Sequence, residues 1–376
     1  MSTSAATGHL TSTRTVLDAL AGEPVRLFVV GGIGTGKSTA LEAVRRSLRE
    51  SGRTVVSRIP DPSDTESAVV LDDAHLLDDD LRALVELVDQ ADRTIVVAAE
   101  SRETNPLFRK VSAALEREHT RITLGQLSSG EISHVLTDPS GHPAASEAVS
   151  AVLAASAGIP FLVAAIRDSP RPVTGASAAR AVELALIDRL RRLDQAELEA
   201  LVVASLSTDL GATDLAATLE VDPLRGVDLI DRARGTGLLQ PSYQPGFLRA
   251  VHRAAAHLVG AARHHELEKS LLRTQLESTT LSAHLALELA EHGLRDESLA
   301  RWLRDHAANG HNGTAETVRV HRAAVAAGAD ELRAALADSL AISGDTSAAA
   351  VLADELLGSS SDRQRAAGVR IAAGVA

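Results

Sequence analysis

The stretch FVVGGIGTGKST, residues 28–39, constrains the fold of this 376-residue chain more than any other segment. It matches the pattern G-x-x-x-x-G-K-[ST] at Gly31, Gly36, Lys37 and Ser38. The apolar run before it, residues 25–30, is typical of a strand, and TALEAVRRSLRE after it has helical spacing. This order predicts an α/β domain of the P-loop NTPase type, in which backbone N–H groups of the loop converge on phosphate oxygens.

Lysine is rare in this chain. Of its 38 Lys plus Arg, only Lys37, Lys110 and Lys269 are lysines. A tight loop around phosphates has room for the thin, compact lysine side chain and not for the broad arginine fork. Lys37 is therefore interpreted as the cation that reaches the β- and γ-phosphates of ATP or ADP. The expected nucleotide-binding residues are Gly31, Gly32, Ile33, Gly34, Thr35, Gly36, Lys37, Ser38 and Thr39. The alternative, a glycine-rich turn without a ligand, is disfavoured by the complete motif.

Two carboxylates follow an apolar run of strand type in the stretch SAVVLDDAHLLDDD, residues 67–80. A buried strand that ends in an acid places an oxygen ligand beside the phosphate loop, and Mg²⁺ prefers such hard ligands. We therefore expect Asp72 and the Ser38 hydroxyl to ligate Mg²⁺, and Asp73 to polarise the attacking water. The alternative is an acidic cluster at the start of the next helix, since acids favour that end.

A third apolar run, RTIVVAAESR at residues 93–102, ends in Glu100, Ser101 and Arg102. In an open parallel sheet, ligands lie beyond the carboxyl ends of the strands. Arg102 is therefore a candidate sensor of the γ-phosphate. The alternative is an ordinary surface arginine after a strand.

Composition excludes several function classes. The chain has no Cys, which excludes disulfides and thiolate chemistry. A net charge of −12 and an aromatic content of 2% argue against broad contact with nucleic acid. The uncharged run at 148–166 is interrupted by Pro160, so it is interpreted as a helix pair and not a membrane span. Without a signal-peptide pattern at the start, the chain is expected to be cytoplasmic, with no membrane partner.

Changes in pattern divide the chain into six expected parts: an N-terminal segment (1–22), a P-loop nucleotide-binding domain (23–126), a helical lid (127–178), a winged helix (179–250), a helical linker (251–310) and the start of a TPR-like helix-pair arm (311–376). After the first α/β part, the fold is expected to be mostly α-helical.

Three details of this organisation matter later. The run at 54–59 is followed by a connection that is short for a parallel crossover, so its strand pairing is left open. The segment RHHELEK, residues 263–269, is interpreted as a solvated helix face and not as a metal site. The chain ends inside a helix of the arm without a polar capping repeat, which predicts that the natural protein is longer.

The ordered set of motifs resembles the signal-transduction ATPases with numerous domains, and most closely the LuxR/MalT-type transcriptional regulators of bacteria. The resemblance runs from about Leu17 to the end of the chain. GGIGTGKST is similar to the Walker A motif of that family, VVLDDAHLLD to its Walker B motif with His75 after the acids, and VVAAESR to its sensor strand. The turn GIP resembles the family's Gly-x-Pro turn, which implies that Gly158 and Pro160 contact the adenine; a plain helix break is the alternative.

The resemblance also implies a mechanism. ADP would hold a closed monomer, and a small-molecule inducer on the helical arm, with exchange to ATP, would open the chain and allow self-association. DNA would be bound only through a C-terminal helix–turn–helix, which is not present in this chain. At the winged-helix position where the family carries a His that touches the nucleotide, this chain has Gln244, so we expect Gln244 to make a weaker contact there.

Slow ATP hydrolysis is expected, because no arginine finger from a second protomer is identifiable and such a finger accelerates the reaction by about 10³–10⁵. Two other functions stay open. One is a motor or loader of the broader AAA type, and the other is a scaffold in which the nucleotide is only structural.

Overall fold

The computed structural model describes residues 11–375 except for 21–23, 62–63, 78–79, 91, 103, 118, 138–139, 171 and 310–313. Most of the expected N-terminal segment therefore lies outside the described residues. The chain forms two compact units: Met1–Ala216 with Glu220–Ala261, and Ala217–Leu219 with Ala262–Ala376. Because the expected parts between 23 and 250 fall almost entirely in the first unit, the finer boundaries inside it stay predictions.

A five-stranded parallel sheet organises the first unit. Its strands lie in the order β2 (Val55–Val56), β3 (Ala68–Leu71), β4 (Ile95–Ala99), β1 (Arg26–Val30) and β5 (Ile122–Thr123). The strand–loop–helix prediction is confirmed, because β1 runs through the loop into α2 (Lys37–Glu50). The order also brings the carboxyl ends of β3 and β4 beside that loop.

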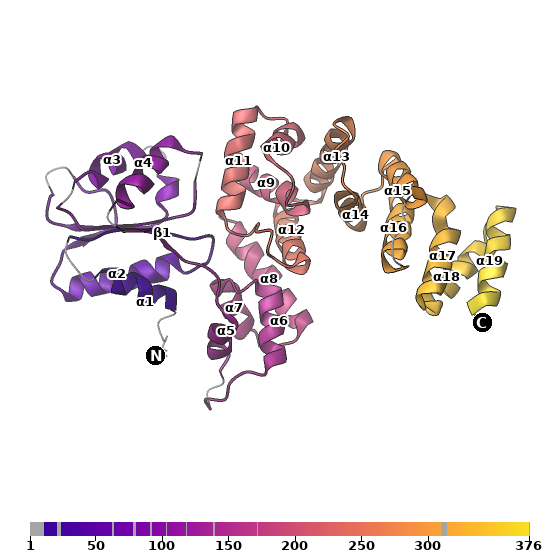
Figure 1. Cartoon of the computed structure of the whole chain (residues 1–376), viewed down its shortest axis with the longest axis horizontal. Helices are drawn as coiled ribbons and strands as arrows, with labels where there is room; N and C mark the ends of the chain where they lie inside the picture. The colour runs from indigo at the N-terminus through magenta and orange to yellow at the C-terminus, as the bar shows by residue number, and fades with distance from the viewer. Residues whose placement is uncertain are drawn as a thin grey trace. The chain divides into compact units, whose positions relative to one another are not determined.

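Helices cover both faces of the sheet, with α1 (Thr11–Asp18) and α2 on one face and α3 (Leu81–Val88) and α4 (Pro106–Leu115) on the other (Figure 1). Successive side chains of β1 point to opposite faces. Leu27 and Val29 are therefore buried in the same core as α1 and α2, whereas Phe28 and Val30 are buried in the core with α3 and α4. A strand buried on both faces must be apolar throughout, which explains the continuous run before the loop.

The pairing of residues 54–59 is settled by the structure. Strand β2 is short and pairs in parallel with β3, with Val55 opposite Ala68 and Val56 opposite Val69. The described residues of the connection, 57–61 and 64–67, contain no helix. A two-residue strand at the edge of the sheet needs little crossover length, which explains how the short connection is tolerated.

The rest of the first unit is helical. Its elements are η1 (Ala74–Leu76), α5 (Ser129–Val135), α6 (Ser146–Ser156), α7 (Pro160–Arg167), α8 (Gly175–Leu190), α9 (Gln195–Leu206), α10 (Ala212–Leu219), α11 (Pro223–Gly235) and α12 (Pro245–Val259). The predicted helix pair broken at Gly158–Pro160 is confirmed as α6 and α7. Residues 179–250 are all described and hold no strand, so the β-wing of a winged helix is not formed there.

The second unit consists of helices: α13 (Ala261–Glu277), α14 (Ala283–Glu291), α15 (Glu297–Asn309), α16 (Thr314–Ala327), η2 (Asp330–Leu332), α17 (Arg333–Ser343), α18 (Thr346–Leu357) and α19 (Asp362–Val375). Glycines directly follow three arm helices, since α16, α17 and α18 stop one residue before Gly328, Gly344 and Gly358. From α14 onward, consecutive α-helices contact each other, as in a helix-pair array. Within the described residues, none of the helices has the length and apolarity to cross a bilayer.

Candidate functional site

The loop between β1 and α2 has the backbone that phosphate binding requires. Gly34 and Gly36 have φ angles of 72° and 97°, in the left-handed region that favours glycine. Gly36 directly precedes the first turn of α2, whose N–H groups lack partners inside the helix. A Cβ built at Gly36 would meet nothing within 4 Å. The helix N-terminus therefore faces open space from which an anion can approach.

Lys37 is held inside this loop. Its Nζ donates to the carbonyl oxygens of Gly31 at 2.8 Å and Gly32 at 2.9 Å, and the residue is only 6% exposed. Burial lowers the pKa of the ammonium, while Glu100, Asp73 and Asp72 act in the opposite direction. The ammonium thus lies among carbonyls and carboxylates at the end of the sheet, where phosphate oxygens would give it stronger, charge-assisted partners.

Two distant segments bind the loop backbone. The N–H of Ile33 donates to the Thr236 carbonyl, which follows α11, at 2.7 Å. The N–H of Phe161, at the start of α7, donates to the Gly34 carbonyl at 3.3 Å. A Cβ on Gly34 would lie 1.9 Å from the Phe161 ring, and a Cβ on Gly32 would lie 2.4 Å from the Thr236 carbonyl oxygen. This close packing requires glycine at both positions, and at Gly34 the left-handed backbone requires it as well.

Asp72 and Asp73 directly follow β3, and both carboxylates are in electrostatic range of Lys37 of the loop. The backbone of Asp73 is left-handed, with φ 48°, and its N–H donates to Asp72 Oδ1 at 2.9 Å. Asp73 is an exposed residue, yet partial burial of its carboxyl and the adjacent Asp72 raise its pKa. Ser38 is also exposed. The two carboxylates and the hydroxyl are oxygen donors of the kind that Mg²⁺ prefers, and their joint role as ligands stays a prediction.

Glu100 and His75 form a buried pair at the end of β4, and sequence analysis gave neither of them a chemical role. The Glu100 N–H donates to His75 Nδ1 at 3.2 Å, and His75 Nε2 lies 3.7 Å from Glu100 Oε2. Burial raises the pKa of Glu100 to about 7. Burial, with Arg102 and Lys37 nearby, lowers the pKa of His75 to about 3, so the imidazole is neutral.

Arg102 is paired with an acid far away in the sequence. Its Nη2 donates to Glu197 Oε1 of α9 at 3.4 Å and lies 3.9 Å from Glu100 Oε2. The same Glu197 oxygen lies 3.4 Å from Nη1 of Arg232 on α11. The buried Nε and Nη1 of Arg102 have no hydrogen-bond partner among the described residues. Arg102 is thus one residue of a buried ion cluster, and a contact with the γ-phosphate stays a prediction.

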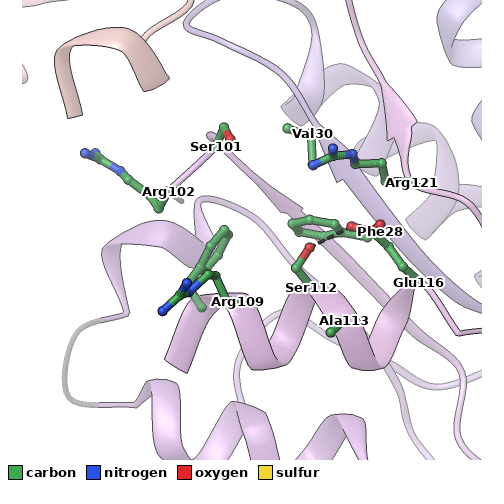
Figure 2. A pocket seen from close by; sticks show the side chains of 10 residues that line it. Phe28, Val30, Ser101, Arg102, Arg109, Ser112, Ala113, Glu116 and Arg121 are labelled. Atoms are coloured by element: carbon green, nitrogen blue, oxygen red, sulfur yellow. Dashed lines mark hydrogen bonds between the residues drawn. The ribbon is translucent and has the colours of Figure 1, made fainter. Parts of the chain in front are cut away.

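Figure 2 shows a cavity of about 490 Å³ between α4 and the sheet. Phe28 and Val30 contribute its floor from β1, and Arg121 lies on one side of it. The guanidinium of Arg102 points away from these residues, in accord with its pairing to Glu197. Arg102 therefore marks the border between this cavity and the ion cluster.

Arg189 of α8 was missed by sequence analysis. It lowers the pKa of both Lys37 and Asp73, which places its charge within electrostatic range of the loop. Arg192, just beyond α8, acts on Asp73 in the same direction. No local motif marks these arginines, because only the packing of α8 brings them to the loop.

A cavity of about 210 Å³ lies directly against the loop. Its lining includes Gly31, Gly32 and Ile33 together with Gln126, Ile159, Gln240 and Tyr243. This volume is below the ~300–1,000 Å³ of a typical small-molecule site, so a whole nucleotide requires some movement of the surrounding helices.

Of the turn at 158–160 and Gln244, only the turn contributes a residue to the lining of this cavity. Gly158 packs against the backbone of Leu127, which donates its N–H to the Gly158 carbonyl at 2.7 Å. Pro160 begins α7. Ile159, which lies between Gly158 and Pro160 in the sequence, lines the cavity. Gln244 is the exposed N-cap of α12 and does not line the cavity, whereas Gln240 and Tyr243 do. Nucleotide contacts of Gly158, Pro160 and Gln244 stay predictions.

Comparison with known proteins gives little further information. A DNA clamp loader delta protein of Bacillus subtilis, YqeN, aligns over 69% of this chain and 98% of its own length, at 14% sequence identity and a TM-score of 0.26. At this TM-score the likeness is too distant to indicate a shared fold or function. None of the known protein-family profiles matches the chain, and no curated protein matches its sequence. Function therefore rests on the geometry of the site.

The geometry fits a magnesium nucleotide. The left-handed glycines, the helix N-terminus and Lys37 form a cradle for phosphates, and Ser38 with Asp72 would hold the ion. Bound Mg²⁺ would neutralise charge on the phosphate oxygens. Asp73 is in electrostatic range of Lys37, and its role in orienting a water stays a prediction.

Replacing Glu100 with Gln is expected to change how stability depends on pH. The folded pKa of about 7 exceeds the unfolded value of 4.5, so Glu100 favours the folded state at low pH, and this contribution is lost as pH rises through 7. Gln does not titrate. The free energy of unfolding of Glu100→Gln should therefore rise relative to that of the unsubstituted chain, by about 3 kcal/mol between pH 4.5 and 7.5.

Urea denaturation at several pH values measures this difference. His75 has the opposite effect on stability. Because its pKa is lowered in the folded state, it makes the folded chain less stable as pH falls below 6.5. This effect is present in both proteins and does not contribute to the difference between them. Glu86→Gln, at an exposed position of α3, is the control and should leave the pH profile unchanged. Parallel profiles for Glu100→Gln and the unsubstituted chain would show that Glu100 titrates normally.

Proposed function

We propose that this chain is a nucleotide-dependent switch that binds ATP or ADP with Mg²⁺ at residues 31–39. The observation that carries the proposal is the pair of backbone hydrogen bonds that join the loop to α7 and to the end of α11, at Phe161 and Thr236. A shift of the backbone at Ile33 or Gly34 would alter these contacts, because the loop backbone itself makes them. Occupancy of the loop is thereby coupled to the helical part of the first unit.

Lys37 provides the second half of this coupling. Its ammonium donates hydrogen bonds to the Gly31 and Gly32 carbonyls. An ammonium has only three N–H donors, so contacts with two phosphates would weaken the hydrogen bonds to these carbonyls. Gly32 also packs against Thr236, so a shift of its carbonyl is transmitted to the segment after α11. The buried Arg102–Glu197–Arg232 cluster holds the end of β4 to α9 and α11 and limits how these helices can move.

The finer proposal is a regulator of the LuxR/MalT type. It is supported by the order of the motifs and by the helix-pair array of the second unit, on which a small-molecule inducer would bind. Exchange of ADP for ATP would then promote self-association, and DNA would be contacted by a helix–turn–helix outside this chain. Size-exclusion chromatography with ADP or ATP tests the self-association, which should appear only with ATP.

A motor or loader of the AAA type uses the same kind of site and differs in turnover. The switch predicts hydrolysis well below one turnover per second, because without an arginine finger from a neighbour the reaction lacks about 10³–10⁵ in rate. Many turnovers per second, dependent on assembly, would instead favour the motor. A scaffold predicts bound nucleotide and no effect of its identity on assembly.

Asp73→Asn is expected to separate binding from hydrolysis. Asn adopts the left-handed backbone of Asp73 with little strain, so the local structure should persist. Affinity for Mg²⁺–ATP should change by less than about threefold, while hydrolysis should fall by about 10²-fold or more, as for loss of a general base. Calorimetry and a phosphate-release assay measure the two effects. An equal loss of affinity would show that Asp73, and not Asp72, is the main metal ligand.

A further inference from the structure

A cluster of two histidines and a glutamate lies in the second unit, away from the phosphate loop in sequence. His264 and Glu268 are on α13, and His292 is the C-cap residue of α14. Residues four apart share one face of a helix, so His264 and Glu268 project together. Glu268 is only 2% exposed, and the two histidines are partly buried. The expectation of a solvated helix face at 263–269 is therefore wrong for Glu268.

The ligand atoms of the three side chains converge. Glu268 Oε1 lies 3.3 Å from His264 Nε2 and 3.1 Å from His292 Nδ1, and the chosen ligand atoms of all three residues lie within 4.8 Å of one another. In a tetrahedral zinc site with metal–ligand bonds of 2.0–2.1 Å, neighbouring ligand atoms are about 3.3 Å apart. The two distances from Glu268 Oε1, 3.3 Å and 3.1 Å, are close to that value.

The cluster also has the outer contacts that metal sites use. The second ring nitrogen of His292, Nε2, lies 3.9 Å from the buried carboxylate of Glu288. Glu288 is in turn held by Arg319 of α16, whose Nη2 donates to Glu288 Oε1 at 3.0 Å. A carboxylate behind a metal-binding imidazole fixes the tautomer and the ring orientation and strengthens the ligand.

We propose that His264, Glu268 and His292 bind a divalent transition-metal ion, and that the ion is Zn²⁺. Two imidazoles and one carboxylate are a donor set that zinc accepts readily, whereas Mg²⁺ and Ca²⁺ prefer oxygen ligands only. The ion would tie α13 to the end of α14 and so stiffen the start of the helix-pair array. A simple hydrogen-bonded His–Glu–His group without a metal is the competing explanation.

Zinc binding to the full chain, without an affinity tag that contains histidine, tests the proposal. Competition with a chromophoric zinc chelator should show one site per chain with a dissociation constant at or below about 1 µM. His264→Ala and His292→Ala should each weaken binding by at least about 100-fold. Glu288→Gln should weaken it by about 10- to 100-fold, as expected for an outer-shell partner. His265→Ala is the matched control, because His265 is the exposed neighbour of His264, and it should bind as the unsubstituted chain does.

Circular dichroism of each variant shows whether it is folded; His264 and His292 are both partly exposed. Visible absorption of the Co²⁺-substituted chain adds a direct readout, since tetrahedral ligand-field bands should appear in the unsubstituted chain and disappear in His264→Ala. Failure of the chain to bind zinc at tenfold excess, or equal affinity of His264→Ala and the unsubstituted chain, would overturn the proposal. Equal loss in His265→Ala would also overturn it, because the binding would then belong to the exposed histidines.

Discussion

Lys37→Ala is expected to weaken the binding of ATP and ADP by at least about 100-fold. Each charge-assisted hydrogen bond to phosphate contributes about 1.5–3 kcal/mol, and a lysine between two phosphates makes more than one of them. Isothermal titration calorimetry with Mg²⁺–ADP measures the loss. Lys110→Ala is the matched control, because Lys110 is an exposed lysine on α4 and should leave the affinity unchanged.

The fold should survive this substitution. Burial lowers the pKa of the Lys37 ammonium, so its charge is not favoured by its surroundings. Its removal leaves the carbonyls of Gly31 and Gly32 without their donor, and it also removes a charge that lowers the pKa of Glu100. Glu100 should then remain protonated to higher pH. Unchanged ADP affinity in a folded Lys37→Ala chain would contradict the site assignment.

Glu197→Ala is expected to lower the free energy of unfolding by about 3 kcal/mol. Glu197 is the shared partner of Arg102 and Arg232, and the Arg102 side chain is only 10% exposed. Without Glu197, Arg102 keeps a single carboxylate, Glu100, at 3.9 Å, and that carboxyl is protonated for part of the time near neutral pH. A buried cation without a partner is strongly destabilising.

Thermal or urea denaturation measures this loss, with Glu147→Ala as the control because Glu147 is an exposed glutamate on α6. Replacing Arg102 with Met in the Glu197→Ala background should restore part of the stability, since the unpaired charge is then removed. Equal stability of Glu197→Ala and the control would mean that the long 3.4 Å contacts contribute little.

The phosphate loop and its two carboxylates were predictable from sequence because the signals are local. A glycine that needs a left-handed backbone, a lysine next to it and a buried strand before it lie within about a dozen residues, and the structure of such a segment depends mostly on its own residues. The same is true of the helix break at Gly158–Pro160 and of the glycines that end the arm helices. Strand β2 was less clear, because its pairing with β3 depends on a connection whose length alone does not choose a partner.

The residues that surround the loop were decided by tertiary structure. Arg102 and Glu197 are 95 residues apart, and Glu268 and His292 are 24 apart. No sequence pattern marks the residues of either pair as partners. A charged residue on a helix or after a strand has the same local sequence whether its side chain is solvated or paired. What distinguishes them is burial, which forces an ionised or polar group to find a partner, and burial is a property of how helices pack. By itself, the sequence determined the strand, loop and helix at which phosphate binding is predicted, whereas packing alone decided which helices contact that loop and which acids and histidines meet.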